Sequence, residues 1–362
     1  MKDFRFSFLV TFVCLLLAGY WGVRSGMGLF SALVLTAALG VMEVSLSFDN
    51  AVVNASILKD MSERWQRIFL TLGILVAVFG MRLFFPIAIV AVATGLGMVE
   101  VSAMALAQPE AYARHLAANH ASIASFGGMF LLLVFLTFLF DAERELFWLG
   151  RIEARLARLG ELKTMSVLLA LLALLGVYLW MPLPPPARLS VLSAGVSGVA
   201  AFMLVNSLDH FFASAAKDEK AANMSNTVNV AKRNGVAGFL YLEALDASFS
   251  FDGVIGAFAI TRDVVVIMLG LGIGAMFVRS LTVHLVRRGT LDEYVFLEHG
   301  AHYAIGALAV IMLAGIVWRV PEILTGLVGV AFIALALISS IRYKKSGKTE
   351  GIMNVPPRKP GI

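Results

Sequence analysis

The sequence contains a single cysteine and few charged residues. Cys14 by itself cannot form an intrachain disulfide, and the lack of CxxC and HExxH patterns excludes thiolate metal sites and zincin chemistry. Charged residues make up only 15% of the chain, whereas hydrophobic residues make up 59% and the mean hydropathy is +0.86. A soluble domain cannot bury so many apolar side chains. The composition therefore predicts a polytopic, all-α membrane protein that has the lipid bilayer as a partner.

Ten apolar segments are long enough to cross about 30 Å of hydrocarbon as helices. The second segment is too long for a straight perpendicular span, so we expect it to be tilted or broken near its polar residues. The first lacks a small-residue cleavage site, so we expect an uncleaved helix rather than a signal peptide. We place the segments at 6–23, 28–58, 66–92, 123–140, 165–181, 189–212, 235–260, 264–285, 299–318 and 321–341.

The basic residues between these segments predict an orientation. With the N-terminus inside, 22 of the 29 lysines and arginines lie in cytoplasmic segments, and each outer loop carries one arginine. This bias predicts an integral inner (plasma) membrane protein with both termini in the cytoplasm. The net charge of +5 then reflects basic loops on one membrane face, not a nucleic-acid-binding surface.

Three connecting segments have a composition of their own. Residues 144–163 alternate apolar side chains with arginines, which is typical of an amphipathic helix on the cytoplasmic membrane surface; a solvated linker is the alternative. The prolines at 182 and 184–186 predict a stiff connection between two halves of the chain. The tail from Arg342 is basic and contains proline and glycine, so we expect it to be disordered.

Two apolar segments carry the same acidic motif. Glu43 to Asn50 reads EVSLSFDN, and Asp246 to Gly253 reads DASFSFDG, so that acid, serine, serine, phenylalanine and aspartate align without a gap. A carboxylate inside a membrane helix costs about 2.5 to 3.5 kcal/mol on insertion scales, so such residues are rarely accidental. Two acids and matched hydroxyls in each segment predict a site for a hard cation, built from an internal repeat.

The predicted orientation makes this repeat an inverted one. The helix over 28–58 runs from outside to inside and the helix over 235–260 runs the other way, while the following span of each half carries one arginine, Arg82 or Arg279. Inverted repeats of this kind build secondary transporters around a midplane site. We therefore divide the chain into three-helix repeats at 28–140 and 235–318, an extra helix at 1–27, a connecting region at 141–234, a last helix at 319–341 and a tail at 342–362.

The spacing of the acids limits how they can bind an ion. Glu43 and Asp49 lie six residues apart, which on a regular helix is about 120° around the axis and about 9 Å along it. Both can hold one cation only if the helix unwinds between them; otherwise two ion positions are stacked by depth. On antiparallel helices, we expect Glu43 to lie level with Asp252 and Asp49 level with Asp246.

Oxygen ligands favour magnesium, calcium or manganese, and paired carboxylates favour a divalent ion with possible binding of protons. No organic cofactor is expected. A structural network, with the two arginines as counter-ions, is the alternative for the acids. Glu243 is either an extra ligand or a charge at the inner face, and Glu298 either supports transport or caps a helix. The predicted metal ligands are Glu43, Asp49, Asp246 and Asp252, and the predicted supporting residues are Ser45, Ser47, Asn50, Ser248, Ser250, Arg82, Arg279, Glu243 and Glu298.

Several other ionisable residues keep more than one interpretation. His115 and His120, in a predicted outer loop, could capture metal or simply be solvated. The roles of Asp141, Asp209, His299 and His302 also stay open, with helix capping and proton transfer as alternatives.

The two motifs, the following arginines and the glycines at 127, 128 and 300 resemble the TerC family of integral membrane proteins. The string LEALDASFSFDG, from Leu242 to Gly253, is similar to the branch of that family called domain of unknown function 475. The resemblance covers most of residues 28–318. It implies inverted three-helix repeats and an association with export of manganese or other cations and with tellurium resistance. Family members commonly have serine where this chain has Gly253, which removes one possible ligand.

The sequence thus favours a divalent cation transporter, with manganese export by alternating access as the leading hypothesis. An intramembrane enzyme with Asp49 and Asp252 as an aspartyl pair is a second hypothesis, although the expected Gly-x-Gly-Asp pattern is absent. A non-transporting scaffold that gathers partners through residues 144–163 is a third.

Overall fold

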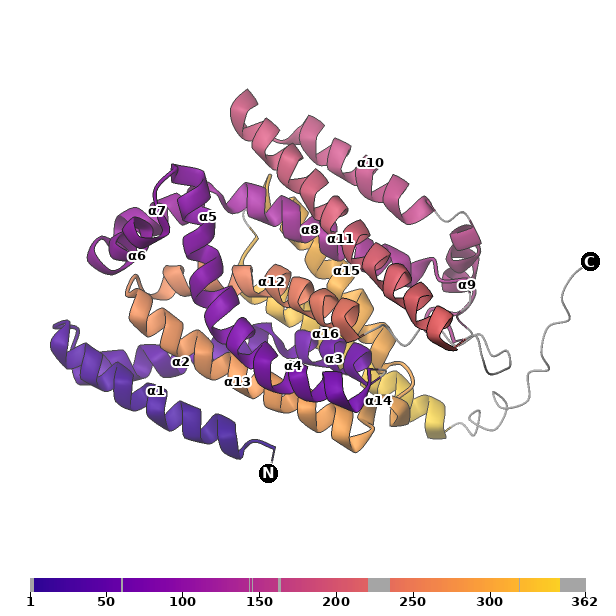
Figure 1. Ribbon diagram of the computed structural model, residues 1–362, viewed down its shortest axis with the longest axis horizontal. Coiled ribbons are helices and arrows are strands. Elements are labelled where there is room, and N and C mark those ends of the chain that lie inside the picture. The colour runs from indigo at the N-terminus through magenta and orange to yellow at the C-terminus, as the bar shows by residue number, and fades with distance from the viewer. Residues whose placement is uncertain are drawn as a thin grey trace, which may run out of the picture.

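The computed structural model describes residues 3–59, 61–142, 144, 146–161, 164–220, 235–318 and 320–345. Every regular element in these ranges is a helix (Figure 1). The helices are α1 (Arg5–Arg24), α2 (Leu29–Leu46), α3 (Phe48–Leu58), α4 (Glu63–Leu75), π-helix η1 (Val76–Phe84), α5 (Phe85–Thr94), α6 (Met98–Ala107), α7 (Pro109–Ala118), α8 (His120–Leu139), α9 (Arg151–Arg158), 3₁₀-helix η2 (Leu159–Glu161), α10 (Met165–Trp180), α11 (Pro185–Lys220), α12 (Gly235–Ile260), α13 (Val264–Arg288), α14 (Thr290–Glu293), α15 (Leu297–Gly315) and α16 (Glu322–Lys345).

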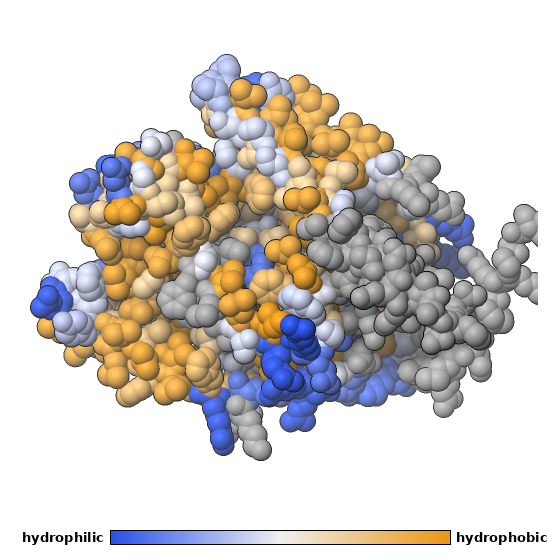
Figure 2. Space-filling model, in the orientation of Figure 1, coloured by the Kyte–Doolittle hydropathy of each residue, from blue (hydrophilic) through white to orange (hydrophobic). Residues whose placement is uncertain are grey.

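Within the described ranges, seven helices are long and apolar enough to cross a membrane: α1, α2, α8, α11, α13, α15 and α16. The surface agrees with a membrane environment, because large apolar side chains such as Phe30, Val92 and Trp180 are 79%, 86% and 78% exposed. Figure 2 shows hydrophobic residues over much of this face, with hydrophilic ones gathered at its left tip and along its lower edge. Exposed apolar surface on this scale is expected only where lipid or another protein covers it.

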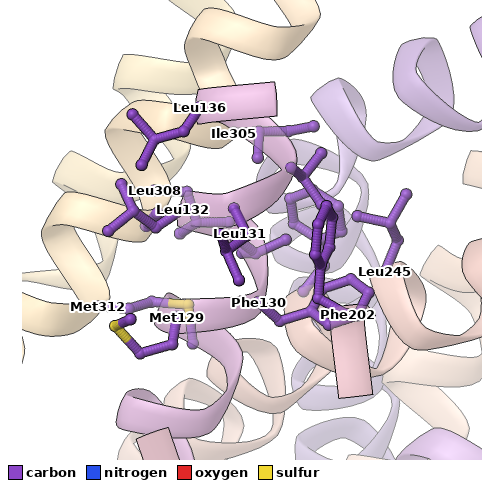
Figure 3. Close-up of a cluster of buried hydrophobic side chains, with 14 of the residues drawn as sticks. Met129, Phe130, Leu131, Leu132, Leu136, Phe202, Leu245, Ile305, Leu308 and Met312 are labelled. Carbon is purple, nitrogen blue, oxygen red and sulfur yellow. The ribbon is translucent and has the colours of Figure 1, made fainter. Parts of the chain in front are cut away.

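The core forms around α8. After His120 this helix contains no ionisable residue, and Phe130, Leu131 and Leu133 are completely buried. A helix that is apolar on all sides belongs in an interior. It contacts α10, α11, α12 and α15. Figure 3 shows its side chains facing those of α15 and, on another side, Phe202 of α11 and Leu245 of α12.

Glycines let the helices around α8 approach closely. A Cβ added at Gly198 of α11 would lie 2.3 Å from the carbonyl oxygen of Phe126 on α8. A Cβ added at Gly300 of α15 would lie 2.4 Å from the Cβ of Ala336 on α16. Small residues at such crossings are how membrane helices gain packing contact without a hydrophobic driving force. α11 therefore lies along α8, and α16 lies along α15.

The helix α4–η1–α5 is continuous in the chain but changes its winding. Pro86 has no backbone N–H to donate and its ring clashes with the carbonyl four residues earlier, which is that of Arg82. The π-helical segment Val76–Phe84 lies just before it and contains Arg82. Short π-helical segments often occur at functional sites.

Three expectations for the connecting regions were wrong in part. In the described part of 144–163, the regular elements are the eight-residue helix α9 and the short η2, and Gly150, with a φ of 60°, precedes α9. The segment predicted to be an outer loop contains two helices, α6 and α7, so that His115 is on α7 and His120 begins α8. The last helix runs on to Lys345, past the predicted start of the tail at Arg342; the rest of the tail is outside the described residues.

Candidate functional site

The first motif lies at an interruption between two helices. α2 ends at Leu46 and α3 begins at Phe48, with Ser47 between them at a φ of −103° and ψ of 16°. The backbone N–H of Asn50 donates to Oδ1 of Asp49 (2.9 Å), so the Asp49 side chain binds an N–H in the first turn of α3. This interruption is the one expected near the polar residues of a long span. The second motif lies in α12, which is continuous from Gly235 to Ile260.

Glu43 is buried between helices of both halves. Its carboxylate forms an ion pair with Arg82 and accepts a hydrogen bond from Ser47 Oγ (3.0 Å). A Cβ added at Gly253 of α12 would lie 2.6 Å from Glu43 Oε2, and one at Gly274 of α13 would lie 2.3 Å from Glu43 Cβ. The two glycines thus provide the space that this side chain occupies. Gly253 is also the position at which the family resemblance leads one to expect serine.

Asp49 faces a different environment. Its carboxylate lies against α16, because a Cβ added at Gly329 would be 2.8 Å from Asp49 Oδ2. It also lines a cavity of about 780 Å³, together with Ser47 and Gly253 and with His120 and Trp318. The remaining lining residues are mostly apolar, so Asp49 is the single acidic side chain among the described residues of this cavity.

The two motifs meet through Asn50 and Asp246. Nδ2 of Asn50 donates to Oδ1 of Asp246 across 2.8 Å, and both side chains are buried. Asp246 therefore lies beside the residue that follows Asp49, and Glu43 lies beside the residue that follows Asp252. The levels expected from the sequence, Asp49 with Asp246 and Glu43 with Asp252, stay a prediction, because the hydrogen bond joins Asp246 to Asn50 rather than to Asp49. The side chain of Asp252 is outside the described residues.

A second, small cavity lies next to Asp246. It has a volume of about 30 Å³, and its lining contains two arginines, two acids of α12 and two further polar side chains. Arg279 lies over the ring of Phe69, 4.7 Å from its centroid, and interacts electrostatically with Asp246 and Glu243. The polar lining residues are Asn54, Arg82, Glu243, Asp246, Arg279 and Thr282.

Not all predicted site residues come together. Ser45 is exposed, and its hydroxyl donates to the carbonyl of Val41 in its own helix. Ser248 is buried but donates to the carbonyl of Ala244 (2.9 Å). Ser250 is buried, and its hydroxyl has no hydrogen-bond partner among the described residues. Within those residues, no group of three or more His, Cys, Asp or Glu side chains is placed to hold a metal ion.

Glu298 lies away from the motifs. Its carboxylate is 3.6 Å from Nζ of Lys59, and its side chain is 44% exposed. Nε2 of the neighbouring His299 donates to the carbonyl of Leu146 (3.0 Å), and His302 stacks on the ring of Phe138 with 3.9 Å between the ring centroids. These contacts favour structural roles for the two histidines. The side chain of Asp209 is outside the described residues.

The sequence analysis missed four polar or small residues at the site. Asn54 follows Asn50 by one turn of α3, and Thr282 follows Arg279 by three residues on α13, so helical periodicity could have indicated both. Gly274 and Gly329 carry no such signal, because only the packing of other helices against them gives them a role.

A buried ion pair, also unexpected, holds the segment before α9. Glu153 is completely buried and accepts from Arg144 Nη1 (2.6 Å) and from the N–H of Leu149 (2.9 Å). Arg144 also lies over the ring of Phe138, at the end of α8.

Nearer the N-terminus, Asp3 forms hydrogen bonds with His284 and Arg287, which hold the pKa of its carboxyl below the ordinary value.

Comparison with protein families matches residues 48–347 to the family described as "Protein of unknown function (DUF475)". The match includes the whole second motif and the last three residues of the first, Phe48 to Asn50, and it confirms the family that the motifs resemble. No curated protein and no solved structure matches the chain.

Proposed function

Because the chain belongs to the DUF475 family and carries buried motif acids next to two cavities, we propose that it is a transporter of divalent metal cations, with manganese export as its activity. The observation that carries this proposal is the meeting of the motifs. Asp49 lines the large cavity, Asp246 lines the small one, and Asn50 joins them by a hydrogen bond. Buried carboxylates without a structural need are expensive in a membrane helix, so an ion is the natural partner.

The proposed architecture has ten spans and two inverted three-helix repeats. To the seven apolar helices we add α4–η1–α5, α10 and α12, of which α10 is short and α12 carries three acids. Helix contacts support the repeat if α3 corresponds to α12, α8 to α15, and α11 to α16. The contact of α3 with α15 then corresponds to that of α12 with α8, and the packing of α16 along α15 corresponds to that of α11 along α8. Exchanging the halves therefore preserves these neighbours, as expected for a pseudo-twofold relation.

The orientation proposed for the membrane places both termini in the cytoplasm. Its support is the uneven distribution of basic residues, of which 22 of 29 fall in the segments assigned to that side. The large cavity, with Trp318 and His120 in its lining, then lies toward the outer side, and the small cavity toward the inner side. In the alternating-access cycle that we propose, the ion passes between Asp49 and Asp246 when the Asn50 contact opens.

Mutation of Asp49 to Asn tests the proposal. The change keeps the shape of the side chain but removes the negative charge, so we expect Mn²⁺ flux into proteoliposomes to fall by about tenfold or more. The Glu293→Gln variant is a matched control, because that side chain is 51% exposed and paired with Lys344. Equal flux in the Asp49→Asn variant and in the unaltered protein would rule out this site.

A further inference from the structure

The small cavity beside Asp246 has room for an ion and at most a few water molecules. Its volume is about 30 Å³, and a cavity needs about 10–15 Å³ to hold one water. It is formed by α3, α4, η1, α12 and α13, so both halves of the chain contribute to it. A hydrated divalent ion with its first shell does not fit in such a space, whereas a dehydrated ion does.

Four oxygen atoms that line or adjoin this cavity accept no hydrogen bond from the described residues. They are Oδ1 of Asn54, both carboxylate oxygens of Glu243 and Oδ2 of Asp246. These side chains are only 5%, 7% and 8% exposed. Buried acceptors in native proteins nearly always have a partner, so the cavity calls for a ligand that attracts oxygen lone pairs. Thr282, on the opposite helix, adds a hydroxyl oxygen to the lining.

The charges around the cavity select the valence of that ligand. Among the described side chains, three carboxylates (Glu43, Glu243 and Asp246) face two guanidinium groups. Arg82 pairs with Glu43 and also interacts with Asp246, and Arg279 interacts with both acids of α12. Once Arg82 is paired with Glu43, the two described acids of α12 face Arg279, and one negative charge is left over among these described side chains. A monovalent cation neutralises that charge.

We propose that this cavity is a binding site for a monovalent alkali cation of the size of Na⁺, held by Asn54, Glu243 and Asp246. We further propose that the bound Na⁺ is the coupling ion for divalent transport, and this part of the inference rests on the proposed function. Asp246 connects the two events, because its other oxygen accepts the hydrogen bond from Asn50, the neighbour of Asp49. Binding of Na⁺ at Asp246 therefore changes the environment of the acid in the large cavity.

Binding is tested on the purified full-length protein in detergent, without any transport assay. Thermal unfolding is followed while NaCl replaces choline chloride at constant ionic strength and pH. We expect a saturable stabilisation by Na⁺, with the half-saturating concentration raised about tenfold or more by Glu243→Gln and by Asn54→Ala. The exposed Glu293→Gln control should respond like the unaltered protein.

The unaltered protein decides the matter even if a variant fails to fold, because the absence of a saturable Na⁺ effect overturns the proposal. It is also overturned if Na⁺ stabilises all variants equally. A titration with Mn²⁺ is a third test. If Mn²⁺ stabilises the protein against thermal unfolding and Glu243→Gln abolishes only the stabilisation by Mn²⁺, the cavity binds the divalent ion and the Na⁺ proposal is overturned.

Flux measurements separate this proposal from the proposed function. Mn²⁺ uptake into proteoliposomes is compared with a Na⁺ gradient and with choline in its place, at equal pH on both sides. Uptake that requires the Na⁺ gradient and is lost in Glu243→Gln supports both. Na⁺ binding without any Mn²⁺ flux supports the Na⁺ site and overturns divalent transport. Mn²⁺ flux without Na⁺ dependence and without Na⁺ binding supports divalent transport and overturns the Na⁺ site.

Discussion

The buried position of Glu43 depends on two neighbouring glycines, which have no side chains. Its carboxylate lies where a side chain at position 253 would be, its Cβ and Cγ lie where a side chain at position 274 would be, and its charge is balanced by Arg82. Removing one partner of a buried ion pair costs about 3–5 kcal/mol, because the other charge stays buried without compensation. A glycine in place of serine in the second motif therefore makes room for an acid from the first motif.

The variant Gly253→Ala tests this interpretation. The new Cβ would lie 2.6 Å from Glu43 Oε2, so we expect overpacking to lower the free energy of unfolding by about 1–3 kcal/mol relative to the same substitution at a position with free space. Gly176→Ala on α10 is the matched control, because no atom lies within 4 Å of its added Cβ. Alanine in a helix is favoured over glycine by about 1 kcal/mol in both variants, so their difference isolates the contact. Equal melting temperatures for the two variants would contradict the packing argument.

At the scale of elements, the segment leading into α9 is attached to the bundle by one buried charge. Glu153 of α9 binds Arg144 and the N–H of Leu149, and Arg144 packs on Phe138 at the end of α8. His299 of α15 lies 3.7 Å from the same carboxylate. An eight-residue helix is too short to be stable by itself, so these contacts hold it in place.

Substitution of Glu153 by Gln should release this segment. The change leaves Arg144 without its carboxylate, and we expect proteolytic cleavage within residues 141–164 to become about tenfold faster or more, since a loss of only 1.4 kcal/mol changes an opening equilibrium tenfold. Glu110→Gln provides the control, because its ion pair with Arg262 is exposed and such pairs contribute little. Cleavage at the same rate in both variants would show that Glu153 does not hold the segment.

At the scale of the whole molecule, the proposed topology places α7 and α14 on opposite sides of the membrane. After Cys14→Ala removes the single native thiol, Glu110→Cys on α7 should react with a membrane-impermeant thiol reagent in intact cells. Glu293→Cys on α14 should react only after permeabilisation. The side chains at 110 and 293 are 66% and 51% exposed, so access through protein does not limit the reaction. Labelling of both positions from the same side would contradict the ten-span arrangement.

Much of this protein followed from its amino-acid pattern. The apolar segments predicted where helices form, because 18 or more apolar residues satisfy both the bilayer and the backbone. The motifs predicted the family, and the excessive length of the segment 28–58 predicted an interruption, which lies at Ser47. These features depend on composition and spacing along the chain, so local physical chemistry determines them.

Only the tertiary structure decided what surrounds each acid. Gly329 of α16 lies against Asp49, Gly274 of α13 lies against Glu43, and Asn50 rather than a second acid binds Asp246. The tertiary structure also placed Asp49 and Asp246 at different cavities, and it placed Ser45 at the surface. These outcomes depend on where helices distant in sequence cross and on how closely glycines allow them to approach, and no periodicity within one helix contains that information.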